Sequence, residues 1–491
     1  MSLHAQMSPE AKARLAAQKR TSTITSILIA LLGCALVAII LMVIALTINV
    51  KNPPEIISYS SGVMDDDQIE RPEMTNQVER KPSSPSSSMA KVIASTTASP
   101  TAVPVPDIEI TEPSLDFGNG DDFGDGWGDG DGDGGGGGGF GRIPSSMKKR
   151  CSKADRLARL KKEGGKPECE EAVVRSLRYL QNTQNANGSW CRKNSSAMTG
   201  LALLAYLGHC ETPLSPEFGE TVEKAITYLV QLGIQNGGQL AEDRNDKHWP
   251  YEHGIATYAL CEAYTFCKTL NITIPNLDKV VIESVGHIVS HQHTSGGWVY
   301  AFEMSNGPGD TSVSCWQIQA LKASKHTGLQ IDGLNGAMKK SMKYLTESQN
   351  GDGTIGYRGK KHSGLGPTMT GGGLLCLQQG GYGRRSQARS AAKWLSKNLK
   401  YNYANDADLY AHYYNGQALI NYGGTVWKNY NKLFMDEHLS GQNPDGSWKS
   451  PGTNKGSRRF QGGSAQAVHY RTCLATLMLE VYYRFLPGSA Q

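Results

Sequence analysis

Apolar residues recur at helical spacing along the last two-thirds of the chain, in segments that come in pairs. The first segment of a pair carries a narrow apolar stripe, for example Val173, Leu177 and Leu180. The second segment is apolar on most sides and richer in small residues, as in Met198 to Leu207 and Ala465 to Tyr483. A striped helix packs on one side, whereas a helix that is apolar all round is buried. The pattern predicts six hairpins, each of an outer and an inner helix.

A short motif, Gln-x-x-x-Gly-x-Trp, lies at the turn of several hairpins. Complete copies run from Gln184 to Trp190, Gln292 to Trp298 and Gln442 to Trp448. The copy from Gln349 to Ile355 has lost its tryptophan, and a weaker echo begins at Gln235. We expect the glycine to permit the turn, the glutamine amide to satisfy main-chain groups at helix ends, and the indole to cover the neighbouring hairpin. The motif is therefore predicted to be a structural clamp.

Motifs of this form, about fifty residues apart, resemble the prenyltransferase and squalene-oxidase repeat of the squalene-hopene cyclase (terpenoid cyclase) superfamily. The resemblance covers roughly Glu168 to Phe485. It implies an all-α fold, an (α/α)6 barrel or terpenoid cyclase/prenyltransferase toroid, which we assign to residues 148–491. The β subunits of protein prenyltransferases and the thioester domains of complement-like proteins share this toroid, so the fold spans enzymes, prenyl binders and protein-binding modules.

The first part of the chain has a different composition. An uncharged run rich in Leu, Ile, Val and Ala, from Ile27 to Ile48, is long enough to span a bilayer, and four basic residues precede it. We predict a cytoplasmic N-terminus at residues 1–23 and a transmembrane signal-anchor at 24–48. Residues 49–147 are rich in Pro, Ser, Gly and Asp, which predicts a disordered linker. The protein is thus predicted to be single-pass, with its barrel extracytoplasmic, either periplasmic or at the cell surface.

Charge and cysteine content restrict the partners and the redox chemistry. The net charge of +5 is modest and both signs are mixed along the barrel, so nothing indicates nucleic acid. Ten cysteines include Cys34 in the predicted anchor, which leaves an odd number outside it and argues against complete pairing. Cys151 with Cys169 is the one pair that we expect to form a disulfide.

Candidate catalytic residues come from the amino ends of the inner helices, which converge on one mouth of such a barrel. Asp408 and His412 are four apart and share a helical face, and a carboxylate that orients an imidazole makes a general acid or base. Asp310 opens another inner helix. Asp310, Asp408 and His412 are therefore the candidate catalytic residues. The alternative is that the carboxylates cap their helices and the imidazole packs near the rim.

Candidate ligand-binding residues lie on the same helices. His253 enters the second inner helix near the mouth, where it could be a ligand, a base or a hydrogen-bonded rim residue. Tyrosines and a tryptophan line the predicted inner wall, and such a wall can hold an apolar ligand or be ordinary barrel lining. The candidates are His253, Tyr258, Trp316, Tyr413 and Tyr414.

The catalytic signatures of the relatives are missing from the barrel. The Asp-x-Asp-Asp acid cluster of squalene-hopene cyclases does not occur, since Asp406-Ala-Asp408 is followed by Leu409. Asp310 and Cys315 follow the order of zinc ligands in prenyltransferase β subunits, but their spacing puts them on different sides of a helix. No metal and no cofactor is predicted.

Two functions remain open at this point. One is a membrane-anchored binding module whose ligand is an isoprenoid, a lipid or a peptide and which lacks the cyclase acid motif. The other is an isoprenoid cyclase or prenyl transferase that uses Asp310, Asp408 and His412.

Overall fold

The computed structural model describes residues 150–304, 307–361, 366–405, 407–452 and 461–484. The predicted N-terminus, signal-anchor and linker, residues 1–147, lie outside the described residues. Within the described ranges, none of the helices combines the length and the apolar character that a bilayer crossing requires.

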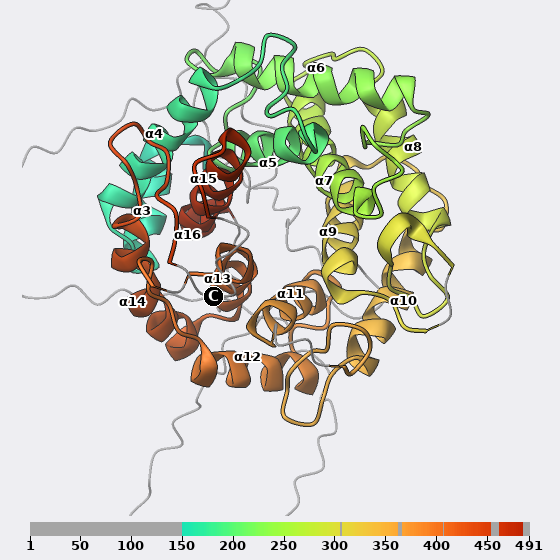
Figure 1. Ribbon diagram of the computed structural model, residues 1–491, viewed down its shortest axis with the longest axis vertical. Helices are drawn as coiled ribbons and strands as arrows, with labels where there is room; N and C mark the ends of the chain where they lie inside the picture. The colour runs from blue at the N-terminus through green and yellow to red at the C-terminus, as the bar shows by residue number, and fades with distance from the viewer. Residues whose placement is uncertain (1–149, 305–306, 362–365, 406, 453–460, 485–491) are drawn as a thin grey trace, which may run out of the picture. The chain divides into compact units, whose positions relative to one another are not determined.

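Two concentric rings of helices make up the described part of the chain (Figure 1). The outer ring consists of α4 (Pro167–Asn182), α6 (Gly219–Gln235), α8 (Leu277–Ser290), α10 (Leu334–Glu347), α12 (Ser386–Asn398) and α14 (Gly424–Leu439). The inner ring consists of α5 (Ser195–Gly208), α7 (Trp249–Thr269), α9 (Thr311–Thr327), α11 (Gly366–Gln379), α13 (Leu409–Tyr422) and α15 (Ala465–Leu479). Each inner helix contacts the next, and α15 contacts α5, which closes the ring. The predicted all-α fold is confirmed, with the six hairpins where the apolar pattern placed them.

Burial explains why the two rings differ in composition. Every residue of α5 is buried, because neighbours surround it on all sides. In α12, by contrast, the buried residues are Ala388, Ala391, Ala392 and Leu395, which form one stripe that faces inward. An outer helix therefore needs a single apolar face, and an inner helix must be apolar or small nearly throughout.

The tryptophans of the motif are clamps, as predicted. Trp190, Trp298 and Trp448 are at most 1% exposed. The indole N–H of Trp190 donates to the main-chain oxygen of Leu180, and that of Trp298 donates to Ile288, both at 2.8 Å. The rings of Trp190 and Trp298 thus each satisfy a carbonyl near the end of the preceding outer helix, whereas the indole N–H of Trp448 donates to the hydroxyl of Ser176 on α4 at 3.0 Å.

The motif glycines allow the closest approach between successive hairpins. Gly188, Gly296, Gly353 and Gly446 all have φ between +89° and +96°, a region that favours glycine. A Cβ atom at any of the four would collide with a main-chain carbonyl of the next outer helix, for example with that of Lys224 at Gly188. Glycine is therefore required at this point of the repeat for both conformation and space.

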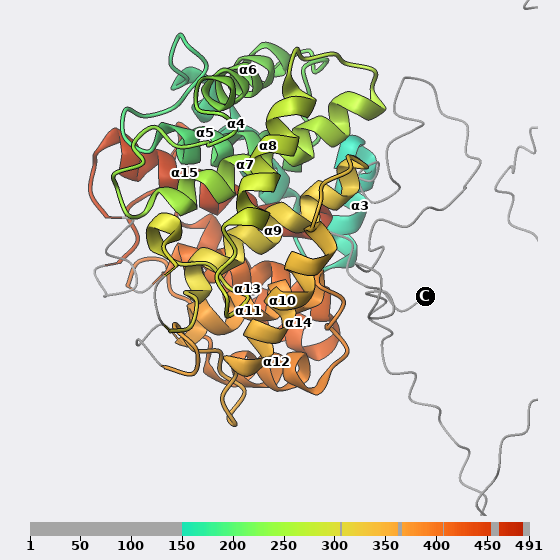
Figure 2. The same ribbon diagram turned by 90° about the vertical axis from the view of Figure 1, so that its right-hand side faces the viewer.

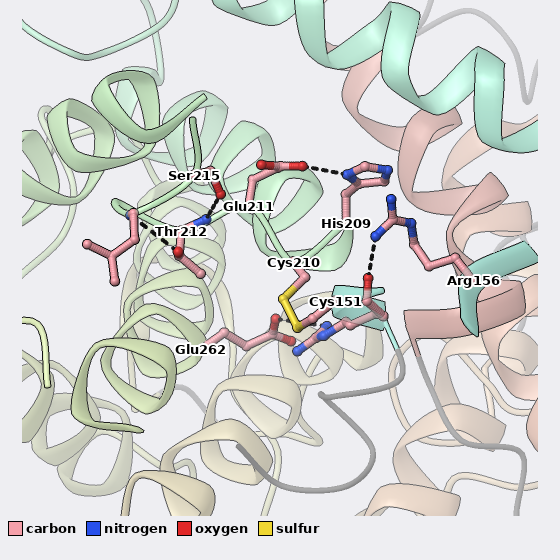
Figure 3. Close-up of a disulfide and its surroundings, with 10 residues drawn as sticks. Cys151, Arg156, His209, Cys210, Glu211, Thr212, Ser215 and Glu262 are labelled. Atoms are coloured by element: carbon pink, nitrogen blue, oxygen red, sulfur yellow. Dashed lines mark hydrogen bonds and ion pairs between the residues drawn. A yellow bond between two sulfur atoms is a disulfide. The ribbon is translucent and has the colours of Figure 1, made fainter. Parts of the chain in front are cut away.

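A disulfide between Cys151 and Cys210 connects the start of the described chain to the residues after α5 (Figure 3). The predicted partner Cys169 was wrong. Cys169 lies in the first turn of α4 and is fully buried as a free thiol. Cys151 instead lies beside Cys210, which takes a left-handed backbone conformation just beyond the inner helix. The sequence pattern could not reveal this neighbour, because the two cysteines come from different elements.

Two short helices complete the unit at one edge. Helix α3 (Lys153–Lys162) begins at Ser152, whose hydroxyl accepts a hydrogen bond from the amide of Asp155. Helix α16 (Val481–Arg484) follows α15 and contacts α3. Figure 2 shows the unit from the side, with α3 at its edge.

Candidate functional site

A pocket of about 380 Å³ lies at the amino ends of the inner helices, and we call it the mouth pocket. Its volume falls near the lower end of the range for small-molecule sites, roughly 300–1,000 Å³. The aromatic residues that line it are Tyr251, Tyr300, Trp316, Tyr357, Tyr410 and Tyr470. The aliphatic residues are Ala197, Met198, Ile255 and Met369, and the polar ones are Asn194, His248, Glu252 and Ser312.

A chain of hydroxyl groups runs along one side of the mouth pocket. The hydroxyls of Tyr357 and Tyr300 are 2.5 Å apart, and those of Tyr300 and Tyr251 are 3.2 Å apart. The Tyr251 hydroxyl lies 2.5 Å from Oγ of Ser312. Burial raises the pKa of both Tyr251 and Tyr357. These phenols are therefore neutral hydrogen-bonding groups across the physiological pH range.

The hydroxyl chain ends on Asp310, which is completely buried. The Oδ1 atom of Asp310 accepts hydrogen bonds from the amides of Ser312 and Val313, at 2.9 and 3.1 Å, and so caps α9. It also accepts from the Ser312 hydroxyl at 2.5 Å. The carboxylate adds to the effect of burial on the pKa of Tyr357. Asp310 thus caps a helix and is also linked through Ser312 to the pocket wall.

Glu252 is a second carboxylate at the pocket, in the first turn of α7. Its side chain lines the pocket and is 3% exposed. It accepts hydrogen bonds from Nδ2 of Asn194 at 2.8 Å and from the Ser196 hydroxyl at 2.7 Å. Burial raises its pKa, the two donors oppose that rise, and the nearby acidic groups Glu242 and Asp246 add to it.

An aromatic cluster forms the deeper wall. The indole N–H of Trp316 donates to the hydroxyl of Tyr410 at 3.0 Å, and both residues line the pocket. Tyr413 stacks on Trp316 with ring centroids 5.3 Å apart, and Tyr414 packs edge-on against Tyr413. Trp316 therefore faces the pocket, with Tyr413 and Tyr414 in contact with the aromatic wall from behind.

Asp408 and His412 take the contacts expected of a cap and a packed ring. Oδ1 of Asp408 accepts from the amides of Tyr410 and Ala411, each at 3.2 Å. Nδ1 of His412 lies 3.0 Å from the hydroxyl of Tyr430 on α14, and the two rings are stacked. Burial lowers the pKa of His412 to about 3. The imidazole is thus turned toward the outer helix, and neither residue is among those that line the mouth pocket.

His253 and Tyr258 also lie away from the pocket lining. Nδ1 of His253 accepts from the amide of Leu240, and Nε2 lies 3.0 Å from the main-chain oxygen of Ser284. Both ring nitrogens are therefore hydrogen-bonded to main-chain groups. The Tyr258 hydroxyl accepts from Arg484 at 3.2 Å, in a buried ionic cluster beyond the middle of α7.

The same ionic cluster joins the first and last described segments. Arg484 pairs with Glu262 at 3.1 Å, and Arg150 lies 3.7 Å from the same carboxylate. All three side chains are at most 3% exposed. The disulfide of Cys151 lies beside this cluster (Figure 3). Ion pairs and a covalent bond therefore both hold the first described residues against the barrel.

Tyr300 and Tyr357 are pocket residues that sequence reasoning missed. Each follows the last position of a motif copy by two residues, after Trp298 and after Ile355. This regularity in two successive repeats was a signal that could have found them. The connections that carry them bring both hydroxyls to the amino end of α9, where Asp310 also lies.

Within the described residues, no three His, Cys, Asp or Glu side chains lie close enough together to hold a metal ion. Asp310 and His412 are engaged by a helix end and by Tyr430 respectively.

Comparison with known proteins gives structural similarity only. No family model matches the chain, and no curated protein does. Type II terpene cyclase MstE from Scytonema, in complex with geranylgeranyl dihydroxybenzoate, is 12% identical, with a TM-score of 0.41 over 65% of this chain and 98% of the cyclase. Its complex with merosterolic acid A has 12% identity and a TM-score of 0.43 over the same shares. A protein from Actinoplanes is 13% identical, with a TM-score of 0.40 over 64% of this chain and 99% of its own.

Proposed function

We propose that the barrel binds an apolar ligand of the isoprenoid or lipid class in the mouth pocket, with the polar end of the ligand against the hydroxyl chain. The observation that carries this proposal is the division of the lining. Trp316 and Ile255 lie deeper along their helices than Ser312 and Tyr251, so an apolar wall lies beyond a rim of hydrogen-bonding groups. Small-molecule sites combine an apolar body with a few polar groups that fix orientation in this way.

A pocket-filling variant tests the proposal. Farnesol and geranylgeraniol are titrated into the full-length chain in lipid nanodiscs, with tryptophan fluorescence and calorimetry as readouts. Ala197→Phe adds a ring to a lining position and is expected to abolish saturable binding, since the pocket is small. Leu214→Phe, at a site that is 64% exposed, is the control and should bind like the parent. Equal binding by both variants would place the ligand elsewhere, and no binding by the parent would remove the proposal.

An enzyme of isoprenoid chemistry is the second candidate, and one observation favours it. Asp310 is a buried carboxylate that is linked to the pocket through Ser312 and Tyr251, which is a path along which a proton can pass. Incubation of the same prenyl alcohols and of their diphosphates with the protein, followed by mass spectrometry, distinguishes turnover from retention. Unchanged ligand after long incubation favours the binding module.

The proposal places this site outside the cytoplasm, on a single signal-anchor at residues 24–48. The uncharged segment and the basic residues before it support the orientation. The Cys151–Cys210 disulfide supports it independently, because structural disulfides persist in oxidising compartments. Protease added to intact cells should release the barrel by cleavage within residues 49–147. Release only after lysis would reverse the topology.

A further inference from the structure

We infer that the mouth pocket selects a ligand whose polar end carries a positive charge, such as an alkyl ammonium. This inference rests on the proposed function, because the same pocket is taken to hold the apolar part of the ligand. It adds the chemical class of the end group, which the apolar wall alone does not determine.

The lining of the mouth pocket carries a negative charge on Glu252. Glu252 lines the pocket, and its hydrogen-bond partners Asn194 and Ser196 are neutral. The charged groups that act on it, Glu242 and Asp246, are acidic as well. A buried carboxylate with no cation beside it is costly unless another positive charge approaches. A cationic ligand would supply that charge.

Asp310 contributes a second negative group behind the hydroxyl chain. The described groups that hydrogen-bond to it are two main-chain amides and the hydroxyls of Ser312 and Tyr357, none of which carries a positive charge. It is fully buried, so solvent screens its charge little. Because Tyr251 lies against Ser312, the field of this carboxylate reaches the pocket through polarisable hydroxyls.

The aromatic residues supply the third argument. Six of the described lining residues are tyrosine or tryptophan, and the faces of such rings attract cations, most strongly where water is excluded. Lysine and arginine are absent from the described lining residues. His248, the histidine among them, is hydrogen-bonded to Asp246 at 2.8 Å, and Lys193 acts on that same Asp246. An anionic end group would therefore meet two carboxylates, with no lysine or arginine among the described lining residues to pair with it.

A matched pair of ligands tests the inference. One is an alkyl chain that ends in trimethylammonium, and the other is the same chain ending in tert-butyl, which has the same shape without the charge. Both are titrated into the full-length chain in zwitterionic nanodiscs, with empty nanodiscs as the blank. We expect the cation to bind more tightly by on the order of tenfold or more, as a desolvated cation–aromatic site with a carboxylate implies. Equal affinities would overturn the inference and leave the proposed function intact, whereas no binding of either ligand would remove both.

Glu252→Gln identifies the group responsible. Gln keeps the shape, its amide oxygen can still accept from Asn194, and its NH2 group can donate to the Ser196 hydroxyl. We therefore expect the preference for the cation to fall to about threefold or less, with the tert-butyl ligand bound as before. Glu223→Gln, on the exposed face of α6, removes the same charge elsewhere and should keep the full preference. An unchanged preference in Glu252→Gln would contradict the assignment.

Acid titration of the parent protein gives the same test without a mutation. Protonation of Glu252 removes its charge, so the preference for the cation should fall as the pH is lowered through the pKa of this group, which burial raises above its ordinary value. Affinity for the tert-butyl ligand should stay level over that range. The groups that face Glu252 are Asn194, Ser196, Glu242 and Asp246. A cation preference that stays constant to pH 4 would overturn the inference.

Discussion

The side-chain amide of Gln442 donates a hydrogen bond to the main-chain oxygen of Ala172 at 2.7 Å, which joins the last hairpin of the ring to the first. The same joint recurs inside the ring, where Gln184 donates to the oxygen of Thr221 and Gln292 to that of Ala337. Each of these amides also donates to the carbonyl of its own motif glycine. The closure of the barrel is therefore made by the same unit as the joints between consecutive hairpins.

Gln442→Glu should weaken this closure. The substitution keeps the shape, but it replaces the donor with a carboxylate oxygen that would face the carbonyls of Ala172 and Gly446. We expect a loss of about 1–3 kcal/mol in the free energy of unfolding, as for a buried hydrogen bond left unmade. Denaturant unfolding of the full-length chain measures it. Gln330→Glu, at an exposed loop position, is the control and should change the free energy little.

Trp298→Ala should lower the free energy of unfolding by more than Gln442→Glu does. The indole is fully buried, and its N–H satisfies the carbonyl of Ile288. Removal leaves a cavity and an unpaired main-chain oxygen, so we expect a loss of about 3–5 kcal/mol. Trp394→Ala, on the half-buried side of α12, is the comparison and should cost clearly less. A Trp298→Ala variant as stable as Trp394→Ala would contradict the role of clamp.

The fold could be predicted because its determinants are periodic and local. The outer and inner helical patterns repeat six times and the turn motif recurs in five complete or partial copies, so a departure in one copy, such as Ile355 in place of tryptophan, changes little. Ile355 is itself buried, and its main-chain amide donates to the hydroxyl of Thr370, as the amides of Trp190 and Trp298 donate to hydroxyls of their inner helices. The substitution therefore changes the side chain while the repeat geometry stays.

The site was only partly predictable from the sequence, because some of its residues lie in connections between helices, where no helical periodicity indicates which way a side chain faces. The mouth pocket lies at the amino ends of the inner helices, and Trp316 is among the residues that line it. Tyr300 and Tyr357 each stand two residues after a motif copy, which singles them out, but their meeting at Asp310 depends on how their connections pack. Helical spacing placed Asp408 and His412 on one face, but the His412 ring turns toward Tyr430 because an outer helix lies there.

Acid should destabilise the barrel below about pH 6.5. Burial lowers the pKa of His253, His412 and His438 to about 3 each, whereas a histidine in the unfolded chain has a pKa of about 6.5. Because the folded pKa values are depressed, the unfolded state binds more protons between these limits. Stability is then fully present above pH 6.5 and falls as the pH drops toward 3, by up to about 1.4 kcal/mol per histidine per pH unit.

The pKa of His209 is shifted in the opposite direction, so this histidine opposes the acid destabilisation caused by the other three. Burial acts to lower its pKa, but hydrogen bonds to Glu170 and Glu211 outweigh burial and raise it. Its contribution is therefore complete below about pH 6.5 and is lost as the pH rises through the folded pKa. Unfolding free energies measured from pH 8 to pH 4 should still decline toward acid, since the three depressed histidines outnumber it. A profile that is flat or rises toward pH 4 would contradict the burial of these rings.

Removal of the disulfide should destabilise the unit without changing its helices. The Cys151–Cys210 bond closes a loop with a sequence separation of 59, and loop-closure entropy sets an upper limit of about 4 kcal/mol on its contribution. The double variant with serine at both positions should melt at a lower temperature than the parent, with the same helical circular dichroism. Reductant should lower the melting temperature of the parent and leave the variant unchanged. An insensitive parent would mean that the bond does not form in the protein.

Asp310 and Asp408 cap equivalent inner helices, but only Asp310 is connected to the mouth pocket, so a comparison of the two distinguishes capping from ligand binding. Asp310 and Asp408 each accept two main-chain amides at the start of an inner helix. Asparagine caps a helix about as well as aspartate, so Asp310→Asn and Asp408→Asn should each change the free energy of unfolding by less than about 1 kcal/mol. The Ser312 hydroxyl links only the first of them to Tyr251 and the pocket wall.

The affinity for a cationic ligand should therefore fall in Asp310→Asn and stay unchanged in Asp408→Asn. Asp310→Asn removes the negative charge behind the hydroxyl chain, so it should weaken the binding of a chain that ends in trimethylammonium severalfold, by about 1 kcal/mol for a buried charge acting through polar groups. Asp408→Asn removes a charge from a side chain outside the pocket lining and should bind like the parent. Calorimetry on the folded variants measures both. Equal losses in the two would show that helix capping, and not the connection through Ser312, controls the pocket. An Asp310→Asn variant that binds like the parent would leave this carboxylate with a capping role alone.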